Sequence, residues 1–274
     1  MHDHDRPVPH LQRRQLLWQG VVGAGALTLG PRALRALGAA VPATDLSSAA
    51  TIAAVVVAPP IVTREQWGAD ESLRRASPDF APVNRAIVHH TVTATNEPDP
   101  AGRIRAIQEF HVRGNGWADI GYNFVVDSAG RVYEGRFARN YGPGELHDGE
   151  DGSGREVIGA HALGHNAGSV GIAILGNYAD GGVTPTEATL EAVVAVVAWK
   201  LGSRSIDPGA AGALIGHRDV VSTGCPGDGL YQRLPELRDR ARARAVAATT
   251  ANPSSDGGGL LGGLLDTLGG LLGG

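Results

Sequence analysis

Strand-like and helix-like segments alternate along residues 61–248, and this alternation constrains the fold more than any other feature of the chain. It favours an α/β domain, and a segment of roughly 190 residues has the length of one domain rather than two. The chain contains a single cysteine, so no intrachain disulfide can form and the domain depends on its hydrophobic core. Hydrophobic residues make up 42% of the sequence and charged residues 19%, a balance that excludes a wholly disordered chain.

Two helices are predicted from their N-terminal signals. Asp99-Pro100 combines an N-cap with proline at the first helical position, and the apolar stripe that follows runs to about Arg113. Residues 184–187, Thr-Pro-Thr-Glu, indicate a capping box with proline at the first helical position, and the apolar run behind them stops at Gly202. The predicted strands are residues 85–93, 121–126, 131–135, 169–175 and 213–217, with a hairpin turn at 127–130.

The N-terminal segment differs in composition from the domain. Arg13-Arg14 precedes a moderately apolar stretch, and small residues near Ala43 offer a cleavage point, so residues 1–43 are predicted to be a twin-arginine export signal. A chance arginine pair in an unstructured N-terminus is the alternative. Residues 44–60, rich in Ala, Ser, Val and Pro, are predicted to be a linker. The expected location is therefore extracellular or in the cell envelope.

Residues 249–274 form a low-complexity tail that consists mainly of glycine and leucine. On a helix its leucines would lie on one side, but each interior glycine costs about 1 kcal/mol relative to alanine. We expect the tail to become helical only against an apolar surface, such as a lipid layer, a partner or the domain itself. A floppy low-complexity end is the alternative.

The charge balance narrows the class of partner. The chain has 24 basic and 28 acidic residues and a formal net charge of −4, so nothing favours nucleic acid as a partner. We expect a monomer. The Gly- and acid-rich residues 139–155 lack the spacing of a calcium-binding EF-hand loop, and we expect a solvated loop there.

The histidines and the cysteine raise the possibility of a metal site. Cys225 follows His217 by eight residues, which on a continuous helix would separate them by about 12 Å, too far to bind one ion. A chain reversal is needed, and residues 222–226 (Ser-Thr-Gly-Cys-Pro) permit one. His89 or His90, at the end of an apolar strand, could complete the set. Two imidazoles and a thiolate would hold Zn²⁺ with an open fourth position, which suits hydrolysis. A buried cysteine with unrelated surface histidines is the alternative.

Seven motifs occur in an order that resembles a known family. They are Arg64–Ala69 (REQWGA), Val88–Thr91 (VHHT), Asp119–Phe124 (DIGYNF), Glu134–Arg136 (EGR), Gly159–His161 (GAH), Gly171–Ala173 (GIA) and Gly216–Gly227, which begins GHR and ends CPG. Over residues 61–235 the chain resembles the peptidoglycan recognition protein family, within the zinc N-acetylmuramoyl-L-alanine amidases that also include phage lysozyme-type amidases. The resemblance implies a single α/β domain with a central mixed β-sheet flanked by helices.

The resemblance also assigns a metal centre and catalytic residues. The family's zinc ligands fall on His89, His217 and Cys225. Its catalytic tyrosine falls on Tyr122, whose hydroxyl would sit beside the zinc-bound water or the developing oxyanion. Thr223 takes the position where phage members carry a lysine, and it could donate one neutral hydrogen bond there.

Further positions match the family's substrate groove. The substrate-binding residues implied by the resemblance are His111, Arg136, His161 and Asn166. Glu134 is another candidate proton carrier. His165 stands where many members have an aromatic residue, and Gly116-Trp117 resembles a pair associated with stem peptides of the diaminopimelate type.

The implied activity is zinc-dependent hydrolysis of the amide bond between N-acetylmuramic acid and the L-alanine of the peptidoglycan stem peptide. The implied partner is peptidoglycan and the implied cofactor is Zn²⁺. A non-catalytic peptidoglycan-binding module and a zinc hydrolase of some other amide are the alternatives. Non-catalytic relatives typically lose the cysteine ligand, which this chain keeps as Cys225.

Overall fold

The computed structural model describes residues 56–180 and 182–250. The predicted export signal, most of the predicted linker and nearly all of the predicted C-terminal tail lie outside these residues. No helix within the described part of the chain is long and apolar enough to cross a membrane.

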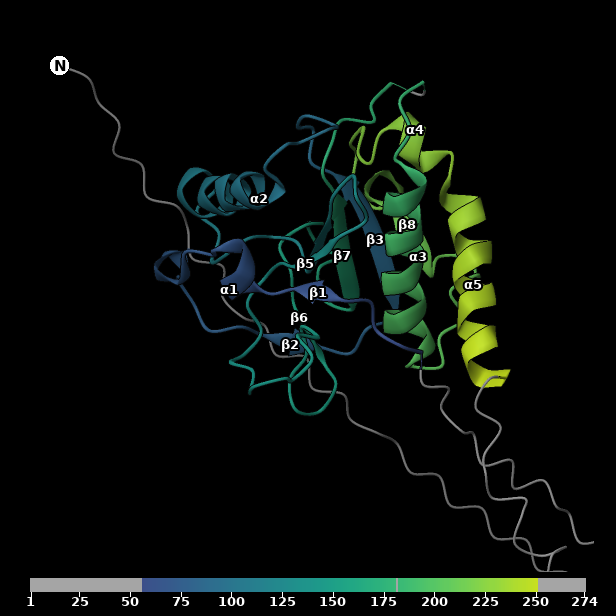
Figure 1. The fold of residues 1–274 in the computed structure, drawn as a ribbon, viewed down its shortest axis with the longest axis horizontal. Helices are drawn as coiled ribbons and strands as arrows, with labels where there is room; N and C mark the ends of the chain where they lie inside the picture. The colour runs from purple at the N-terminus through teal and green to yellow at the C-terminus, as the bar shows by residue number, and fades with distance from the viewer. Residues whose placement is uncertain (1–55, 181, 251–274) are drawn as a thin grey trace, which may run out of the picture. The chain divides into compact units, whose positions relative to one another are not determined.

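A six-stranded mixed sheet forms the centre of the domain (Figure 1). In spatial order its strands are β1 (Ile61–Val62), β5 (Val132–Glu134), β4 (Phe124–Val126), β7 (Ser169–Ile174), β3 (Arg85–His90) and β8 (Leu214–Gly216). Neighbouring strands run parallel except β4 and β5, which form an antiparallel hairpin. Strands β2 (Phe80–Ala81) and β6 (Glu156–Val157) make a separate antiparallel pair. The expectation of a mixed sheet flanked by helices is confirmed.

Helices cover both faces of the sheet. Helices α3 (Glu187–Gly202) and α5 (Leu234–Thr250) run side by side on one face (Figure 1). Helices α1 (Arg64–Trp67) and α2 (Pro100–Glu109) pack on the other face. The fourth helix, α4 (Asp228–Tyr231), is a single turn that precedes α5.

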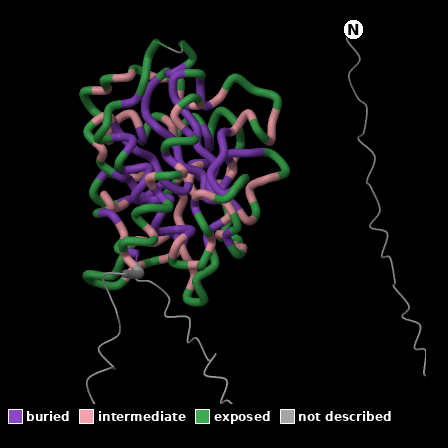
Figure 2. Tube along the Cα trace, turned by 90° about the vertical axis from the view of Figure 1, so that its right-hand side faces the viewer, coloured by how far each residue is buried: buried purple, intermediate pink, exposed green. Residues whose placement is uncertain are grey.

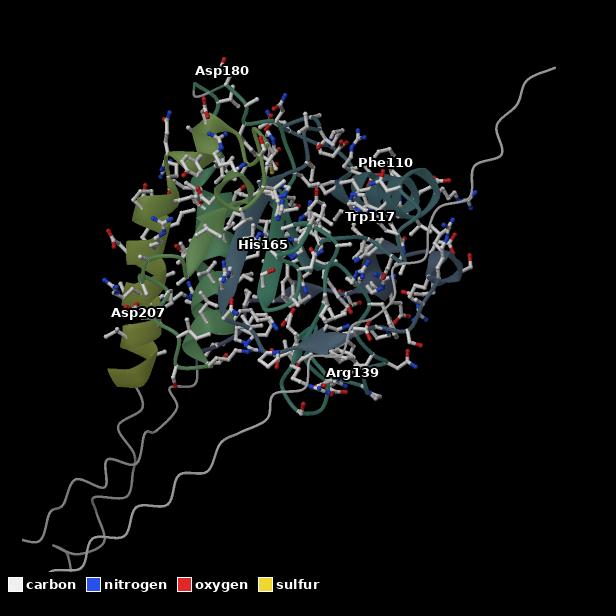
Figure 3. The ribbon with its side chains drawn as sticks, turned by 180° about the vertical axis from the view of Figure 1, so that it is seen from behind. Phe110, Trp117, Arg139, His165, Asp180 and Asp207 are labelled. Carbon is white, nitrogen blue, oxygen red and sulfur yellow. The ribbon has the colours of Figure 1, made fainter. Side chains whose placement is uncertain are left out.

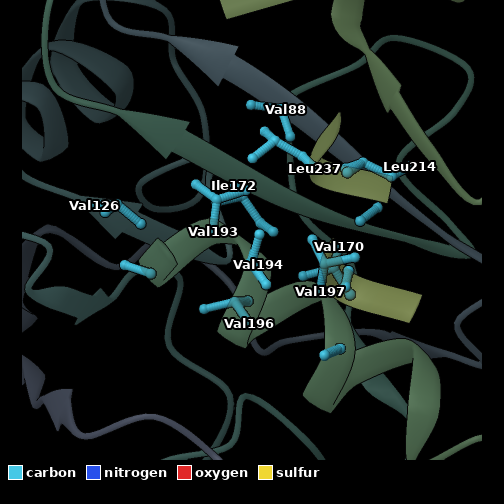
Figure 4. Close-up of a cluster of buried hydrophobic side chains, with 14 of the residues drawn as sticks. Val88, Val126, Val170, Ile172, Val193, Val194, Val196, Val197, Leu214 and Leu237 are labelled. Atoms are coloured by element: carbon cyan, nitrogen blue, oxygen red, sulfur yellow. The ribbon is translucent and has the colours of Figure 1, made fainter. Parts of the chain in front are cut away.

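The main hydrophobic core lies between the sheet and helices α3 and α5. Val88 and Ile172 project from β3 and β7 into this core, where they meet Val193 and Val197 of α3 and Leu237 of α5 (Figure 4). Buried segments run through the interior of the fold and exposed ones lie around it (Figure 2). Because side chains alternate along a strand, the residue after Val88 points to the α2 face of the sheet.

The two predicted helices form, with differences at their ends. Helix α2 begins after Asp99, whose side chain accepts a hydrogen bond from the backbone N–H of Gly102 at 2.9 Å, and its last turn continues as a π-helix over Phe110–Gly114. Helix α3 begins later than predicted: its N-cap is Thr186, so the preceding proline lies outside the helix. A second threonine, closer to the apolar run, takes the capping role.

Several elements carry no clear signal in the sequence. Strands β1, β2 and β6 are two residues long, too short for a periodic pattern. Helix α5 is polar on most sides, and its buried anchors include Leu237 and Ala241. Ion pairs from Arg240 to Glu187 and Glu191 attach it to α3. Tertiary contacts therefore stabilise this helix more than its own periodicity does.

A buried ion cluster joins α3 to the acid-rich loop. The ammonium of Lys200 is fully buried and lies 2.6 Å from Glu156 and 2.7 Å from Glu150. Burial raises the pKa of Glu156 to about 7 in spite of this partner. Other acidic groups of the loop pair with arginines: Glu145 with Arg139 at 2.5 Å and Asp151 with Arg155 at 2.7 Å.

Candidate metal centre and substrate groove

His89, His217 and Cys225 come together at one edge of the sheet. One ligand atom from each residue lies within 4.8 Å of the other two. His89 Nδ1 is 3.7 Å from Cys225 Sγ, and the rings of His89 and His217 have centroids 4.5 Å apart. Among the described residues, this is the group of His, Cys, Asp and Glu side chains that could hold a metal ion.

Parallel strand pairing explains why the two histidines meet. Strands β3 and β8 are neighbours, and Val88 is in register with Gly216. The next residue on each strand is a histidine, so His89 and His217 leave the same edge side by side. His217 then begins a short 3₁₀ turn. Nδ1 of His90 instead accepts a hydrogen bond from the backbone N–H of Tyr178 at 3.2 Å, and the group that could hold a metal contains His89.

The loop that carries the cysteine is tied to the same turn. Arg218 donates its backbone N–H to the carbonyl of Cys225 at 2.9 Å, and its guanidinium contacts the Gly224 carbonyl and pairs with Asp228 at 2.6 Å. Thr223 Oγ1 accepts a hydrogen bond from the backbone N–H of Cys225 at 3.2 Å. The chain reversal expected from the residues around Cys225 is therefore present, and Thr223 helps to shape it.

His161 contacts the metal cluster through the ring of His89. Its Nδ1 lies 3.1 Å from Nε2 of His89, and its own Nε2 lies 3.4 Å from Ser169 Oγ. Ser169 in turn donates to the carbonyl of His165 at 2.6 Å. If His89 presents Nδ1 to a metal, its Nε2–H donates to His161, so this chain fixes the tautomer of His89. Spacing in the sequence gave no indication of this contact, because 72 residues separate the two rings.

Tyr122 and His111 form the wall next to His89. The ring centroid of Tyr122 lies 5.4 Å from the ring centroid of His89 and 5.3 Å from that of His111. His111 Nδ1 accepts the backbone N–H of Gly121 at 3.0 Å, so the neutral ring carries its proton on Nε2. Burial raises the pKa of Tyr122, which keeps its hydroxyl protonated. Both side chains are thus neutral hydrogen-bond donors.

Burial also sets the charge of the other groups. It holds the pKa of His89 well below its ordinary value and lowers that of His161 to about 3 and that of His111 to about 4. It raises the pKa of the Cys225 thiol to about 11. At neutral pH the imidazoles are therefore uncharged, which is the form that binds a metal.

Two further residues predicted to touch substrate hold the loops around the site. The guanidinium of Arg136 donates to the carbonyls of Ile120, at 3.0 Å, and of Ile158, at 3.2 Å. The Asn166 side-chain oxygen accepts the backbone N–H groups of His161 and of the next residue, at 2.8 Å each. Contact of either side chain with a substrate stays a prediction.

Glu134 lies away from the cluster. In the β4–β5 hairpin it is opposite Phe124, whose side chain packs in the α3 core with Val88. Directly opposed residues share a face, so Glu134 and His89 project from opposite faces of the sheet. The Glu134 carboxylate accepts from the backbone N–H of Arg64 at 3.0 Å and lies 2.7 Å from Nδ1 of His147. The prediction that it carries a proton at the site is wrong.

Two cavities adjoin at Thr91 and Tyr122, which line both. The larger, about 730 Å³, reaches the metal cluster at Cys225. The smaller, about 290 Å³, extends toward Phe110 and His111. Together they form one groove with an arm on each side of Tyr122. In the view of Figure 3, His165 lies over the strands, and Phe110 and Trp117 lie to one side of it.

The three clustered residues fit a zinc ion. Zinc bonds of about 2.3 Å to sulfur and about 2.0 Å to nitrogen in a tetrahedral site place these two atoms about 3.5 Å apart, close to the 3.7 Å between Cys225 Sγ and His89 Nδ1. Two imidazoles and one thiolate leave the fourth position open. The supporting hydrogen bond that His89 donates to His161 is also typical of zinc sites.

Comparison with known proteins identifies the family. A model of the N-acetylmuramoyl-L-alanine amidase family (Amidase_2) matches residues 79–228. The chain belongs to this family. A human N-acetylmuramoyl-L-alanine amidase is 38% identical over 183 residues, which cover 64% of this chain and 28% of the human protein. The chain thus spans little more than a quarter of that relative.

Peptidoglycan recognition proteins are similar over most of their length. Peptidoglycan-recognition protein SC2 of Drosophila simulans is 32% identical over 176 residues, which cover 64% of this chain and 84% of the fly protein. The crystal structure of human PGRP-IβC in complex with glycosamyl muramyl pentapeptide aligns with a TM-score of 0.50 and 30% identity, over 64% of this chain and 93% of that chain. The family and fold expected from the sequence motifs are confirmed.

Proposed function

We propose that this protein is a zinc-dependent N-acetylmuramoyl-L-alanine amidase, which hydrolyses the amide between the lactyl group of N-acetylmuramic acid and the L-alanine of the stem peptide. The observation that carries the proposal is the meeting of His89, His217 and Cys225 within 4.8 Å, beside Tyr122 in an open groove. The amidase name of the human relative and the muramyl peptide bound by human PGRP-IβC support the reaction and the substrate class.

The cluster would hold the metal through His89, His217 and Cys225. Zn²⁺ bound there supplies a Lewis acid that polarises the scissile carbonyl and lowers the pKa of a water molecule. His161 keeps the His89 ring in the orientation and tautomer that present Nδ1 to the ion. The remaining steps depend on neutral donors along the groove.

Tyr122 acts where negative charge develops on the carbonyl oxygen. Because its hydroxyl stays protonated, it donates a hydrogen bond that strengthens as the oxyanion forms. His111 presents its Nε2–H from the adjoining arm, where it orients a peptide carbonyl of the substrate. The Thr223 hydroxyl accepts from the Cys225 backbone and retains its own proton for donation.

Digestion of purified peptidoglycan by the full chain tests the proposal. The zinc-loaded wild type should release peptides that begin with alanine and leave the glycan chains intact. Cys225→Ser and His217→Ala should lose both bound zinc and activity, whereas His147→Ala, a histidine hydrogen-bonded to Glu134 on the other side of the sheet, should keep both. Wild-type protein that binds zinc and peptidoglycan but releases no peptide would contradict hydrolysis and favour a binding module.

We further infer from Arg13-Arg14 that the chain reaches its substrate through twin-arginine export. This route carries folded proteins, so a domain that has already bound its metal could be exported. Peptidoglycan lies outside the cytoplasmic membrane, and export would bring the groove to it.

A further inference from the structure

Val92 has a backbone conformation that valine rarely adopts. Its φ is +55°, in the left-handed region, and the other non-glycine residue with positive φ in the described part of the chain is Ser205, at +57°. A β-branched residue in this region is a genuine outlier, because its side chain crowds the backbone. The strand predicted over residues 85–93 ends at His90 for this reason.

Hydrogen bonds on both sides impose this conformation. The backbone N–H groups of Thr91 and Thr93 donate to the carbonyls of Ile174 at 3.1 Å and Gly176 at 3.3 Å. The two threonine hydroxyls lie 2.7 Å apart, and Thr91 Oγ1 accepts the N–H of Gly176 at 3.1 Å. With its neighbours attached to the end of β7, Val92 has to turn its side chain away from them.

The Val92 side chain projects into the groove rather than into a core. It is 62% exposed and lines the 730 Å³ cavity that also contains Cys225 and Thr223. Most of the other lining side chains are polar, and Val92 is the largest aliphatic one. A glycine or asparagine would relieve the backbone strain and an exposed valine contributes no core packing, so folding stability does not explain this residue.

We propose that Val92 is a specificity-determining residue that forms the apolar wall for a methyl-bearing carbon next to the scissile amide. This inference rests on the proposed function, whose substrate carries such a methyl on each side of that bond, in the lactyl group and in L-alanine. The valine side chain is stiff about χ1, and its backbone is held by the two threonines, so the wall is fixed before substrate binds. A fixed contact beside the metal cluster can align the carbonyl for attack.

Three variants of the full chain separate substrate contact from structural support. Val92→Gly removes the wall and the strain, Val92→Thr keeps the shape but replaces a methyl with a hydroxyl, and Ser205→Gly makes the matched change at an exposed left-handed residue in the loop after α3. We expect Val92→Gly to lower kcat/KM on a muramyl-L-alanyl peptide roughly 10- to 200-fold. Its melting temperature should rise by about 1 to 3 °C, as that of Ser205→Gly does, with zinc content unchanged.

The expected combination, higher stability with lower activity, is one that a merely structural valine cannot produce. Val92→Thr should lower kcat/KM without raising the melting temperature, and Ser205→Gly should leave kcat/KM at the wild-type value. A substrate with glycine in place of L-alanine distinguishes the two methyl groups. If the effect of Val92→Gly disappears on that substrate, Val92 contacts the alanyl methyl; if it persists, Val92 contacts the lactyl side.

Wild-type kcat/KM in Val92→Gly would overturn the proposal, and so would a loss of activity that follows loss of zinc. Failure of the proposed function looks different, because the wild type itself would then release no peptide. In that case the affinity of the muramyl-L-alanyl peptide for wild type and Val92→Gly, measured by calorimetry, decides the matter. Equal affinities would refute the proposed contact between Val92 and the substrate, and weaker binding by Val92→Gly would support it.

Discussion

Gly171 lies within the core strand β7, and its substitution by alanine should weaken metal binding at the cluster of His89, His217 and Cys225. A Cβ atom added at Gly171 would lie 2.3 Å from Cδ2, 2.5 Å from Cγ and 2.7 Å from Nε2 of the His161 ring. Ordinary contact needs about 3.5 Å or more, so the ring would have to move by about 1 Å. The 3.1 Å hydrogen bond from His89 Nε2 to His161 Nδ1 would then stretch beyond bonding range.

The size of the effect follows from the role of His161. Loss of the partner of a metal-binding histidine typically costs 10- to 100-fold in metal affinity, or about 1.4 to 2.7 kcal/mol. Overpacking of the strand adds about 1 to 3 kcal/mol of lost folding stability. Zinc affinity can be measured by competition with a chromophoric chelator, and stability by urea denaturation of the metal-free protein.

Two companion variants sharpen this test. Gly152→Ala is the matched control, because its added Cβ would meet nothing within 4 Å, and it should keep wild-type zinc affinity. His161→Ala makes room at Gly171, so the double variant should bind zinc no more weakly than His161→Ala alone and should recover stability lost in Gly171→Ala. Wild-type zinc affinity in Gly171→Ala, or strictly additive losses in the double variant, would refute the reasoning.

Four other predictions concern different parts of the chain. Tyr122→Phe should lower kcat on muramyl peptide about 10²- to 10³-fold with zinc content unchanged, because it removes an oxyanion donor; wild-type kcat would exclude that role. Lys200→Met should cost about 3 to 5 kcal/mol in urea denaturation, because it leaves the buried carboxylate of Glu156 without its cation; a loss below 1 kcal/mol would contradict this. Burial lowers the pKa of His111 to about 4, whereas the unfolded chain titrates near 6.5, so the unfolded state binds more protons between these values and stability falls as pH decreases through them. The free energy of unfolding is about 2 kcal/mol lower at pH 5 than at neutral pH on account of this group. His111→Gln, which keeps a hydrogen-bond acceptor, should flatten this part of the plot of stability against pH. Replacement of Arg13 and Arg14 by lysine should leave the protein in the cytoplasmic fraction on immunoblots, and undiminished export would show that this pair is no signal.

The sequence predicted those parts of the fold that local patterns determine. The apolar run of α3 and the hairpin turn between β4 and β5 form as expected, because capping residues and turn residues act within a few positions of one another. Helix α5 was not predicted, since its polar surface is held by ion pairs to α3 that depend on the tertiary fold. Local sequence carries no trace of such contacts.

In the candidate site, too, local sequence patterns predicted some features and others depend on the tertiary fold. Cys225 and His217 were paired by their spacing and a permissive turn, but the choice between His89 and His90 came only from family resemblance. Residues on adjacent strand positions face opposite sides, and only packing decides which side meets the cluster. The support of His89 by His161 likewise needs the sheet to bring together strands that are distant in the chain.

The metal cluster is therefore positioned by the hydrophobic core. Ala86 and Val88 are fully buried against α3 and α5. A slip of one residue in β3 would turn His89 into that core and turn both apolar side chains to the opposite face of the sheet. The core thus fixes the register in which Val88 pairs with Gly216. This register places His89 beside His217, and the loop held by Arg218 brings Cys225 to them. Because these contacts within the protein position the three ligands, substitutions in the α3 core that shift β3 should weaken metal binding at a distance.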